Sequence, residues 1–457
     1  MKTDKIQFYR DIKSALDSVG PGMCLAKWNQ TTLHLENGHN HSCHHPRTHQ
    51  TPLDELAHDP SALHNTKYKK ALRQQMLSGE RPEECKYCWN IEDTVKTPDT
   101  MSDRVLKSSW EIYHDPAVLE KIITNGAEFN TNPTQLEVSF STTCNFKCSY
   151  CSPDVSSRWM KETLKYGNFP TEDPLISIDA IRANNKMPIS DREYNPYIEA
   201  FWKWWPELYP QLSVFRITGG EPLLHKNTFA VLDWIIDHPQ PELNFAINSN
   251  MCVPPAVLQR FLDKIKEITS RGLIKSFKLY TSAEAYKSQA DYIRFGLDYN
   301  EWYENCRMLL QEVPTAHVSL MSTYNAMSVV SYLDFLKDMC ELKKEFINRL
   351  TIDTVYMANP KCLTIDILPK EFMSYITRQR QYAQIRHGDR LFNDMELLKM
   401  ERIEKYFSSR LETPRSGLAM FRRDFAAFVD EHDRRRGTNF LATFPEMNEF
   451  YNLCKQS

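Results

Sequence analysis

Three cysteines, Cys144, Cys148 and Cys151, are clustered directly after a β-rich run of the chain. Cysteine thiolates are the usual ligands of iron–sulfur clusters. Three of them can hold three irons of a four-iron cluster, which leaves the fourth iron without a protein ligand. That open iron could bind a chelating small molecule and pass an electron to it. The segment therefore predicts a redox-active [4Fe–4S] site rather than a closed structural metal site.

The same spacing has a second interpretation, because positions i, i+4 and i+7 share one face of a helix. Buried free cysteines do occur in protein cores. Three thiols at the end of a strand would nevertheless be an unusual packing choice, and clustered cysteine spacings are specific. The metal site is the stronger hypothesis.

A second motif, Thr218-Gly219-Gly220-Glu221-Pro222, follows the next β-rich run. The chain has only 13 glycines, so two in succession after a strand indicate a special turn or a close approach to a ligand. A carboxylate fixed beside them could bind an ammonium group.

Together the two motifs resemble those of the radical S-adenosylmethionine superfamily. Its CxxxCxxC loop matches Cys144, Cys148 and Cys151, with the usual aromatic residue, Tyr150, before the last cysteine. Its GGEP motif matches the segment 219–222. The resemblance implies that the open iron binds the methionine amino and carboxylate groups of S-adenosylmethionine. Reductive cleavage of that cofactor would give a 5′-deoxyadenosyl radical, so the cofactor would carry the hard chemistry and no catalytic side chain can be named.

The resemblance also implies roles for individual side chains. Glu221 would contact the amino group of the cofactor, and Tyr150 would lie near its adenine. Four polar residues fall near family positions that face the cofactor: Asn248, Asn250, Ser282 and Arg294. Each of these four could equally be an ordinary turn or helix-surface residue.

Four further cysteines lie in the first hundred residues: Cys24, Cys43, Cys85 and Cys88. A hairpin turn predicted at Asn37-Gly38 would bring the first two together. Four thiolates with one CxxC pair can hold a structural zinc or a second [4Fe–4S] cluster. The spacing around Gly38 resembles the hairpin of SPASM and twitch modules, which implies an auxiliary cluster, although such modules normally follow the barrel. Nearby histidines could also be ligands, but loop histidines are more often solvated: His39, His41, His44, His45 and His49.

The elements that must position these motifs alternate between β-rich runs and amphipathic helices, which predicts an α/β fold with parallel strands. The predicted strands span residues 136–141, 214–218, 243–248, 276–281, 317–322 and 350–355. Together with the resemblance, this implies a partial (β/α)6 TIM-type barrel over residues 134–368. A small cysteine-rich module would precede it over residues 1–100, and a helical region would follow it over residues 369–457.

Two stretches have alternative interpretations. The long segment 168–196 and the tryptophan-rich stretch after it read either as a lid over a site or as a surface excursion with a packed helix. The basic run Arg434-Arg435-Arg436 is best read as a solvated helix end.

Composition limits the possible functions. Lysine plus arginine (56) nearly balances aspartate plus glutamate (59), which argues against a protein that coats nucleic acid. No apolar run approaches the length of a membrane span and the first residues lack a signal sequence, so we expect a cytoplasmic protein with reduced cysteines. A radical enzyme would also need an electron donor such as a flavodoxin or ferredoxin.

Three functions remain open on the sequence. The enzyme could modify a peptide or protein side chain, with net oxidation through the auxiliary cluster, as is frequent among enzymes with SPASM or twitch modules. It could instead dehydrogenate or epimerise a small metabolite such as a sugar or nucleoside. A non-catalytic iron–sulfur sensor is a third class, but a sensor needs no S-adenosylmethionine pocket, so the intact motifs argue against it.

Overall fold

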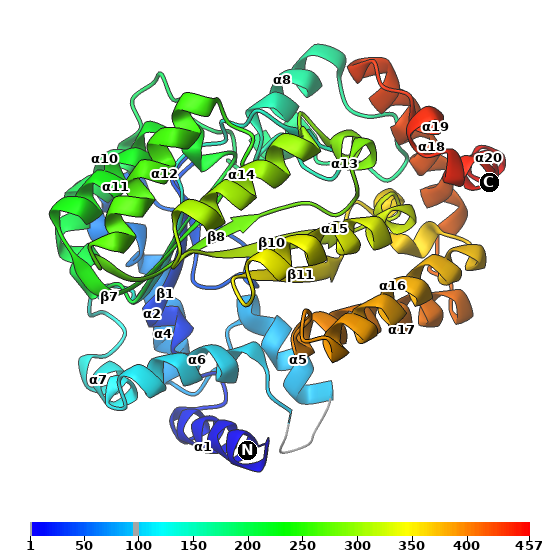
Figure 1. The fold of residues 1–457 in the computed structure, drawn as a ribbon. Helices are drawn as coiled ribbons and strands as arrows, with labels where there is room; N and C mark the ends of the chain where they lie inside the picture. The colour runs from blue at the N-terminus through cyan, green and yellow to red at the C-terminus, as the bar shows by residue number, and fades with distance from the viewer. Residues whose placement is uncertain (1, 95–99) are drawn as a thin grey trace. The chain divides into compact units, whose positions relative to one another are not determined.

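The computed structural model describes residues 2–94 and 100–457 and forms two compact units (Figure 1). The first unit comprises Met1–Ser141 and Pro188–Ile217, and the second comprises Thr142–Met187 and Thr218–Ser457. These units do not follow the three regions predicted at 1–100, 134–368 and 369–457. The physical reason is strand pairing, which joins the first hundred residues to later parts of the chain.

That pairing involves the predicted N-terminal hairpin. Strand β1 (Gln30–His34) pairs with β2 (His39–His41) in antiparallel fashion around a turn containing Gly38. Gly38 has φ = 75°, and a Cβ atom there would collide with the Tyr197 ring, so the turn requires glycine. The other edge of β1 pairs in parallel with β4 (Gln135–Ser139). The order of strands in this unit is β6-β4-β1-β2-β3, with β3 at His49–Gln50 and β6 at Val214–Thr218.

The first unit also contains several helices. They are α1 (Lys2–Val19), α2 (Ala26–Asn29), α3 (Leu53–His58), α4 (Lys67–Leu77), α5 (Lys86–Thr94), α6 (Asp103–His114), α7 (Val118–Asn125) and α10 (Pro196–Leu208). Helix α10 contains the tryptophan-rich stretch. Trp204 and Trp205 are buried, and the Trp205 ring lies 5.0 Å from that of Phe215. The packed-helix interpretation therefore describes this stretch.

The second unit is an α/β structure whose main sheet is parallel. Its strand order is β7-β8-β10-β11, and every pairing in this row is parallel. The strands are β7 (Gln240–Asn248), β8 (Ile274–Thr281), β10 (His317–Tyr324) and β11 (Leu350–Tyr356). Helix α11 (Lys226–Asp237) precedes the first of these strands, and the helices between them are α12 (Pro255–Ser270), α13 (Ser288–Ile293), α14 (Tyr299–Glu312) and α15 (Tyr332–Glu345). All six predicted strands form, two of them in the first unit.

The predicted helical region after the sheet is also present in the second unit. It contains α16 (Met373–Gly388), α17 (Asp394–Glu412), α18 (Leu418–Arg436), α19 (Phe440–Thr443) and α20 (Asn448–Gln456). Helices α16 and α17 run side by side, and α17 packs against β11 (Figure 1). Helix α18 packs against α20.

The first part of the long segment, residues 168–187, contacts helix α18 through hydrogen bonds and ring stacking. It follows α8 (Ser157–Tyr166) and carries α9 (Ile178–Ala183). The Asp424 carboxylate of α18 accepts hydrogen bonds from the backbone N–H groups of Glu172 and Asp173, at 2.6 and 2.9 Å. The rings of Phe169 and Phe428 stack at 4.8 Å. These contacts favour the surface-excursion interpretation for residues 168–187.

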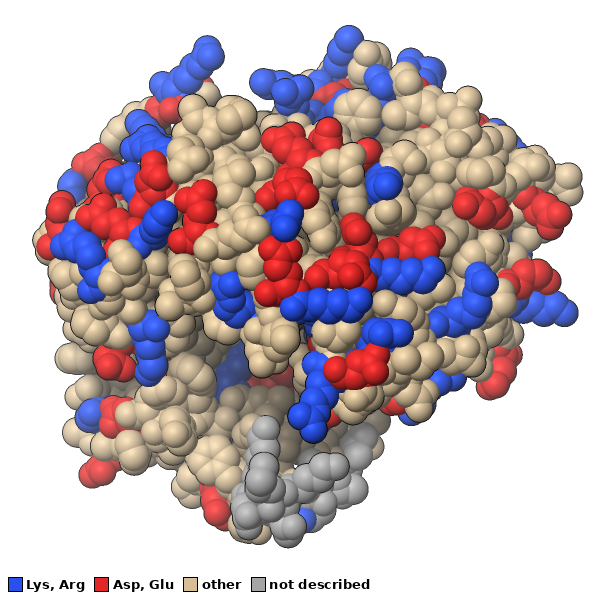
Figure 2. Space-filling model, viewed as in Figure 1, with Lys and Arg blue, Asp and Glu red and all other residues tan. Residues whose placement is uncertain are grey.

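The surface charges and the helix lengths can be described directly. Figure 2 shows basic and acidic side chains intermixed over the face in view. Within the described residues, no helix is both long and apolar enough to span a bilayer.

Candidate active site

The clustered cysteines lie on an irregular loop of the second unit. Only Lys147 and Cys148 are extended, as β5, and they pair in antiparallel fashion with β9 (Arg294–Phe295). The alternative of a shared helix face is therefore wrong, because the segment 144–151 is not helical. As whole residues, all three cysteines are partly exposed.

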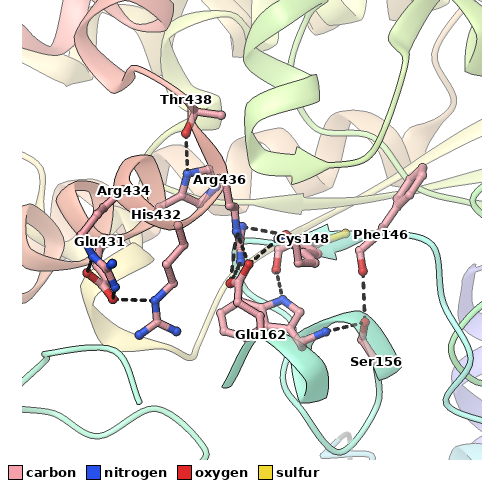
Figure 3. Close-up of polar contacts among 12 residues, drawn as sticks. Phe146, Cys148, Ser156, Glu162, Glu431, His432, Arg434, Arg436 and Thr438 are labelled. Atoms are coloured by element: carbon pink, nitrogen blue, oxygen red, sulfur yellow. Dashed lines mark hydrogen bonds and ion pairs between the residues drawn. The ribbon is translucent and has the colours of Figure 1, made fainter. Parts of the chain in front are cut away.

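The backbone of this loop is held by side-chain donors from the start of α8 (Figure 3). Ser156 Oγ donates to the carbonyl oxygen of Phe146 at 3.0 Å. Trp159 Nε1 donates to the carbonyl oxygen of Cys148 at 2.8 Å. Fixed carbonyl groups keep the loop in one conformation, which a multidentate ligand set requires.

Burial disfavours ionisation of these thiols. It raises the pKa of Cys144 to about 12, and it raises the pKa of Cys148 and Cys151 as well. Arg294 Nη1 lies 3.7 Å from Cys148 Sγ and partly opposes the effect of burial on that thiol. A cationic metal core would supply the missing positive charge, so the donor set fits a metal cluster whose binding releases protons.

Two of the predicted cofactor-binding residues meet at a buried carboxylate. Tyr150 Oη donates to Glu284 Oε1 at 3.1 Å, and Arg294 donates through Nε and Nη2 to Glu284 Oε2 at 2.9 and 2.8 Å. The Arg294 guanidinium also lies 5.4 Å from the centre of the Tyr150 ring. The sequence did not distinguish Glu284 from an ordinary core or surface residue. Its position shortly after β8 was the only signal.

Glu221 joins the GGEP turn to the segment after β7. It is 1% exposed, and its carboxylate accepts hydrogen bonds from Leu223 N–H, Ser249 Oγ and Asn250 N–H at 3.1, 2.8 and 2.6 Å. Burial raises its pKa to about 7. Asn250 Nδ2 in turn donates to Asn145 Oδ1 at 2.7 Å. The acidic motif and the cysteine loop therefore belong to one hydrogen-bonded network.

The other predicted residues lie at the carboxyl ends of parallel strands, the usual location of sites in α/β barrels. Asn248 ends β7 and Ser282 follows β8 directly. Pro222 begins a short 3₁₀ helix, residues Pro222–Leu224. Gly219 has φ = 122°, a conformation that side chains rarely adopt.

Gly220 allows the motif to approach the cysteine loop. A Cβ atom at this position would lie 2.5 Å from the Thr143 carbonyl oxygen and 2.6 Å from that of Thr142. The next residue, Glu221, donates its N–H to the same Thr143 oxygen at 2.7 Å.

Gly220→Ala is therefore expected to lower the free energy of unfolding by about 1–3 kcal/mol, because two backbone oxygens must move. Thermal denaturation followed by circular dichroism measures this loss. Gly388→Ala is the matched control, since a Cβ atom there meets nothing within 4 Å. Equal melting temperatures for the two variants would contradict the close approach.

The four N-terminal cysteines surround a single small cavity within the first unit. It is lined by Cys24, Cys43, Cys85 and Cys88, together with His45, Pro46, Trp89, Asp103, Arg104 and Lys107. Burial raises the pKa of Cys24 to about 12 and that of Cys85 to about 11. Four thiols around one cavity fit a thiolate-bound metal centre. Within residues 2–94 and 100–457, no three His, Cys, Asp or Glu side chains form a ready-made site for a single ion.

The neighbouring histidines are not merely solvated, as the loop position had suggested. A nitrogen of His39 lies 3.0 Å from Thr48 Oγ1, and one of His49 lies 3.1 Å from Thr66 Oγ1. The His45 ring stacks on Tyr87 at 3.7 Å. These partners come from several segments of the first unit, and local composition does not reveal such tertiary contacts.

Comparison with known proteins gave a partial match to two curated proteins. One is the GTP 3′,8-cyclase of Sulfurovum sp. (strain NBC37-1), 26% identical over 128 residues, which is 28% of this chain and 30% of that protein. The other is the GTP 3′,8-cyclase of Sulfurimonas denitrificans, 24% identical over 128 residues, with the same coverage. The match thus spans less than a third of each relative. No protein-family model matches the chain.

Among solved structures, the chain is similar to Streptococcus suis SuiB bound to the precursor peptide SuiA. The TM-score is 0.35 at 11% sequence identity, and the alignment covers 73% of this chain and 63% of that one.

Proposed function

We propose that this chain is a radical S-adenosylmethionine enzyme that abstracts hydrogen from a peptide or protein side chain. Cys144, Cys148 and Cys151 would hold a [4Fe–4S] cluster that binds S-adenosylmethionine. In this proposal the parallel strands contribute to a partial (β/α)6 TIM-type barrel. The single observation that carries it is the hydrogen-bonded network that joins the cysteine loop to the GGEP turn through Asn145 and Asn250.

The bound cluster and cofactor would supply a 5′-deoxyadenosyl radical by one-electron cleavage of a carbon–sulfur bond. The residues of the chain would bind, orient and exclude water. Glu221 would receive the amino group of the cofactor, with Asn248, Ser282 and the glycines of the motif lining the same site. Tyr150 and Arg294, fixed by Glu284, would border the adenosine part. A flavodoxin or ferredoxin in the cytoplasm would supply the electron.

The choice of a peptide substrate rests on the four-cysteine cavity of the first unit. If it holds a second [4Fe–4S] cluster, as in SPASM and twitch modules, an electron acceptor for net oxidation of a side chain is available within the chain. A second candidate, a small metabolite such as a nucleoside, is favoured by the name of the matched relatives, GTP 3′,8-cyclase.

Mass spectrometry separates these two substrates. Reconstituted enzyme, deuterium-labelled S-adenosylmethionine and a reductant are incubated with fractionated cell extract. The proposal expects a peptide that has lost two hydrogens or gained deuterium, together with 5′-deoxyadenosine. Changes confined to the small-metabolite fraction would instead establish the second candidate.

Glu221→Ala is expected to weaken binding of S-adenosylmethionine while leaving the iron content unchanged. Loss of a charge-assisted hydrogen bond should cost about 1.5–3 kcal/mol, or roughly 10–150-fold in the dissociation constant. Isothermal titration calorimetry of the reconstituted protein measures the dissociation constant for S-adenosylmethionine.

Ser249→Ala is the matched control, because it removes one donor to Glu221 and leaves the carboxylate in place. Its effect on affinity should be smaller. A Glu221→Ala protein with full iron and unchanged affinity would contradict the proposed role.

A further inference from the structure

The basic run at the end of α18 is not a solvated helix end. Arg434 is exposed and pairs with Glu431 at 2.6 Å, as a surface residue would. The side chains of Arg435 and Arg436 are 0% exposed. Arg435 Nη2 donates to the carbonyl oxygen of Asn168 at 2.9 Å. The earlier interpretation is therefore correct for Arg434 alone, and the two buried arginines require another explanation.

Arg436 reaches from α18 into the cysteine loop (Figure 3). Its Nη1 donates to the carbonyl oxygen of Lys147 at 2.8 Å, and its Nη2 donates to Glu162 Oε1 at 2.9 Å. Its guanidinium lies over the Trp159 ring, 5.0 Å from the centre, and over Phe295 of β9 at 5.6 Å. One side chain thus contacts the loop, helix α8 and the strand that pairs with the loop.

This contact completes a pattern along the loop backbone. The carbonyl oxygens of three consecutive residues, Phe146, Lys147 and Cys148, each accept a hydrogen bond from a side chain. Ser156 and Trp159 of the α8 region donate to the carbonyl oxygens of Phe146 and Cys148. Arg436 donates to the carbonyl oxygen of Lys147, although it lies 289 residues further along the chain.

Two cations share the Glu162 carboxylate beside the cysteine loop. The Glu162 carboxylate is paired with both Lys147 and Arg436. Arg436 and Glu162 are buried, and an uncompensated buried charge is costly. Arg436 carries its share of this positive charge to the loop through its hydrogen bond to the Lys147 carbonyl oxygen. An anionic thiolate-bound cluster at this loop would compensate it.

We infer that Arg436 is a positioning residue for the cysteine loop, so that the C-terminal helix α18 forms part of the cluster site. The inference rests on the proposed cluster at Cys144, Cys148 and Cys151. Without Arg436, the Lys147 carbonyl loses this side-chain donor, and the loop loses a positive charge that favours the reduced cluster. The cluster should then be held less firmly, and its midpoint potential should become more negative.

Arg436→Met tests this on the full-length protein, because methionine keeps much of the apolar stem and removes the donors and the charge. Changes of outer ligand contacts typically alter metal affinity about 10–100-fold. We therefore expect iron loss to a chelator about 10-fold faster than in wild type. A spectroscopic redox titration should show the more negative potential. Arg434→Met, on the same helix but in an exposed ion pair, should match wild type in both measurements.

The outcomes separate the inference from the function on which it rests. A wild-type protein that takes up no cluster at these cysteines overturns the proposed function. Wild type and Arg436→Met with equal iron retention and equal potential overturn the inference alone.

Arg436→Lys covers the case in which the methionine variant does not fold. Lysine keeps the charge but lacks the planar fork that serves two acceptors. It should therefore retain the wild-type potential while losing iron faster. Wild-type iron retention in a folded Arg436→Lys protein would also count against the inference.

Discussion

Replacing Cys144, Cys148 and Cys151 together with alanine is expected to abolish reductive cleavage of S-adenosylmethionine. The three thiols lie on one loop whose carbonyl groups are fixed by side chains, and no other described cysteine lies on this loop. Without them, this loop has no thiol ligands for the proposed cluster whose open iron would bind the cofactor. Formation of 5′-deoxyadenosine, measured by liquid chromatography with dithionite as reductant, should fall to the level of the enzyme-free reaction.

Cys340→Ala supplies the matched control, because Cys340 is a buried and isolated thiol of α15. It should cleave the cofactor at close to the wild-type rate. Cleavage by the triple variant at the wild-type rate would remove the basis for the proposed activity.

The second large effect concerns the iron content of the first unit. If Cys24, Cys43, Cys85 and Cys88 bind a [4Fe–4S] cluster, anaerobic reconstitution of wild type should give about eight irons per chain. The variant that lacks Cys144, Cys148 and Cys151 should then keep about four irons, because the four cysteines of the first unit are unchanged in it. Metal analysis by plasma mass spectrometry measures both.

A zinc centre predicts a different result, namely about four irons and one zinc in wild type and zinc alone in the triple variant. The double variant Cys85→Ala/Cys88→Ala isolates the cavity, since both thiols line it. It should lose about four irons while retaining those of the cysteine loop. Retention of about eight would show that these thiols are not ligands.

Local signals predicted the elements well. The six strands form because their alternation of apolar and polar residues matches a sheet buried on one face, and the Asn37-Gly38 turn forms because Gly38 tolerates a positive φ. The cysteine and glycine motifs marked the two segments of the candidate site, and the hydrogen bond between Asn145 and Asn250 that joins them became visible only in the structure.

Tertiary pairing could not be predicted in the same way. Nothing in the sequence of β1 indicates that β4 is its partner, and the boundaries of the compact units depend on that pairing. A single carboxylate such as Glu284 has no distinctive local pattern until Tyr150 and Arg294 meet it. The burial of Arg436 likewise depends on a segment far away in the sequence, so charge patterning alone assigned it to solvent.

The pairing of β1 with β4 has a consequence during synthesis of the protein. Gln30 lies opposite Gln135, so β1 leaves the ribosome well before its parallel partner exists. Until then, one edge of β1 presents unpaired N–H and C=O groups, and its buried residues Thr31 and Leu33 lack part of their cover. Non-local pairing of this kind is slow to form and prone to aggregation. In a fragment of residues 1–100, this edge of β1 would stay unpaired. We therefore expect the four-cysteine region to remain soluble only in a fragment that also includes β4, residues Gln135–Ser139.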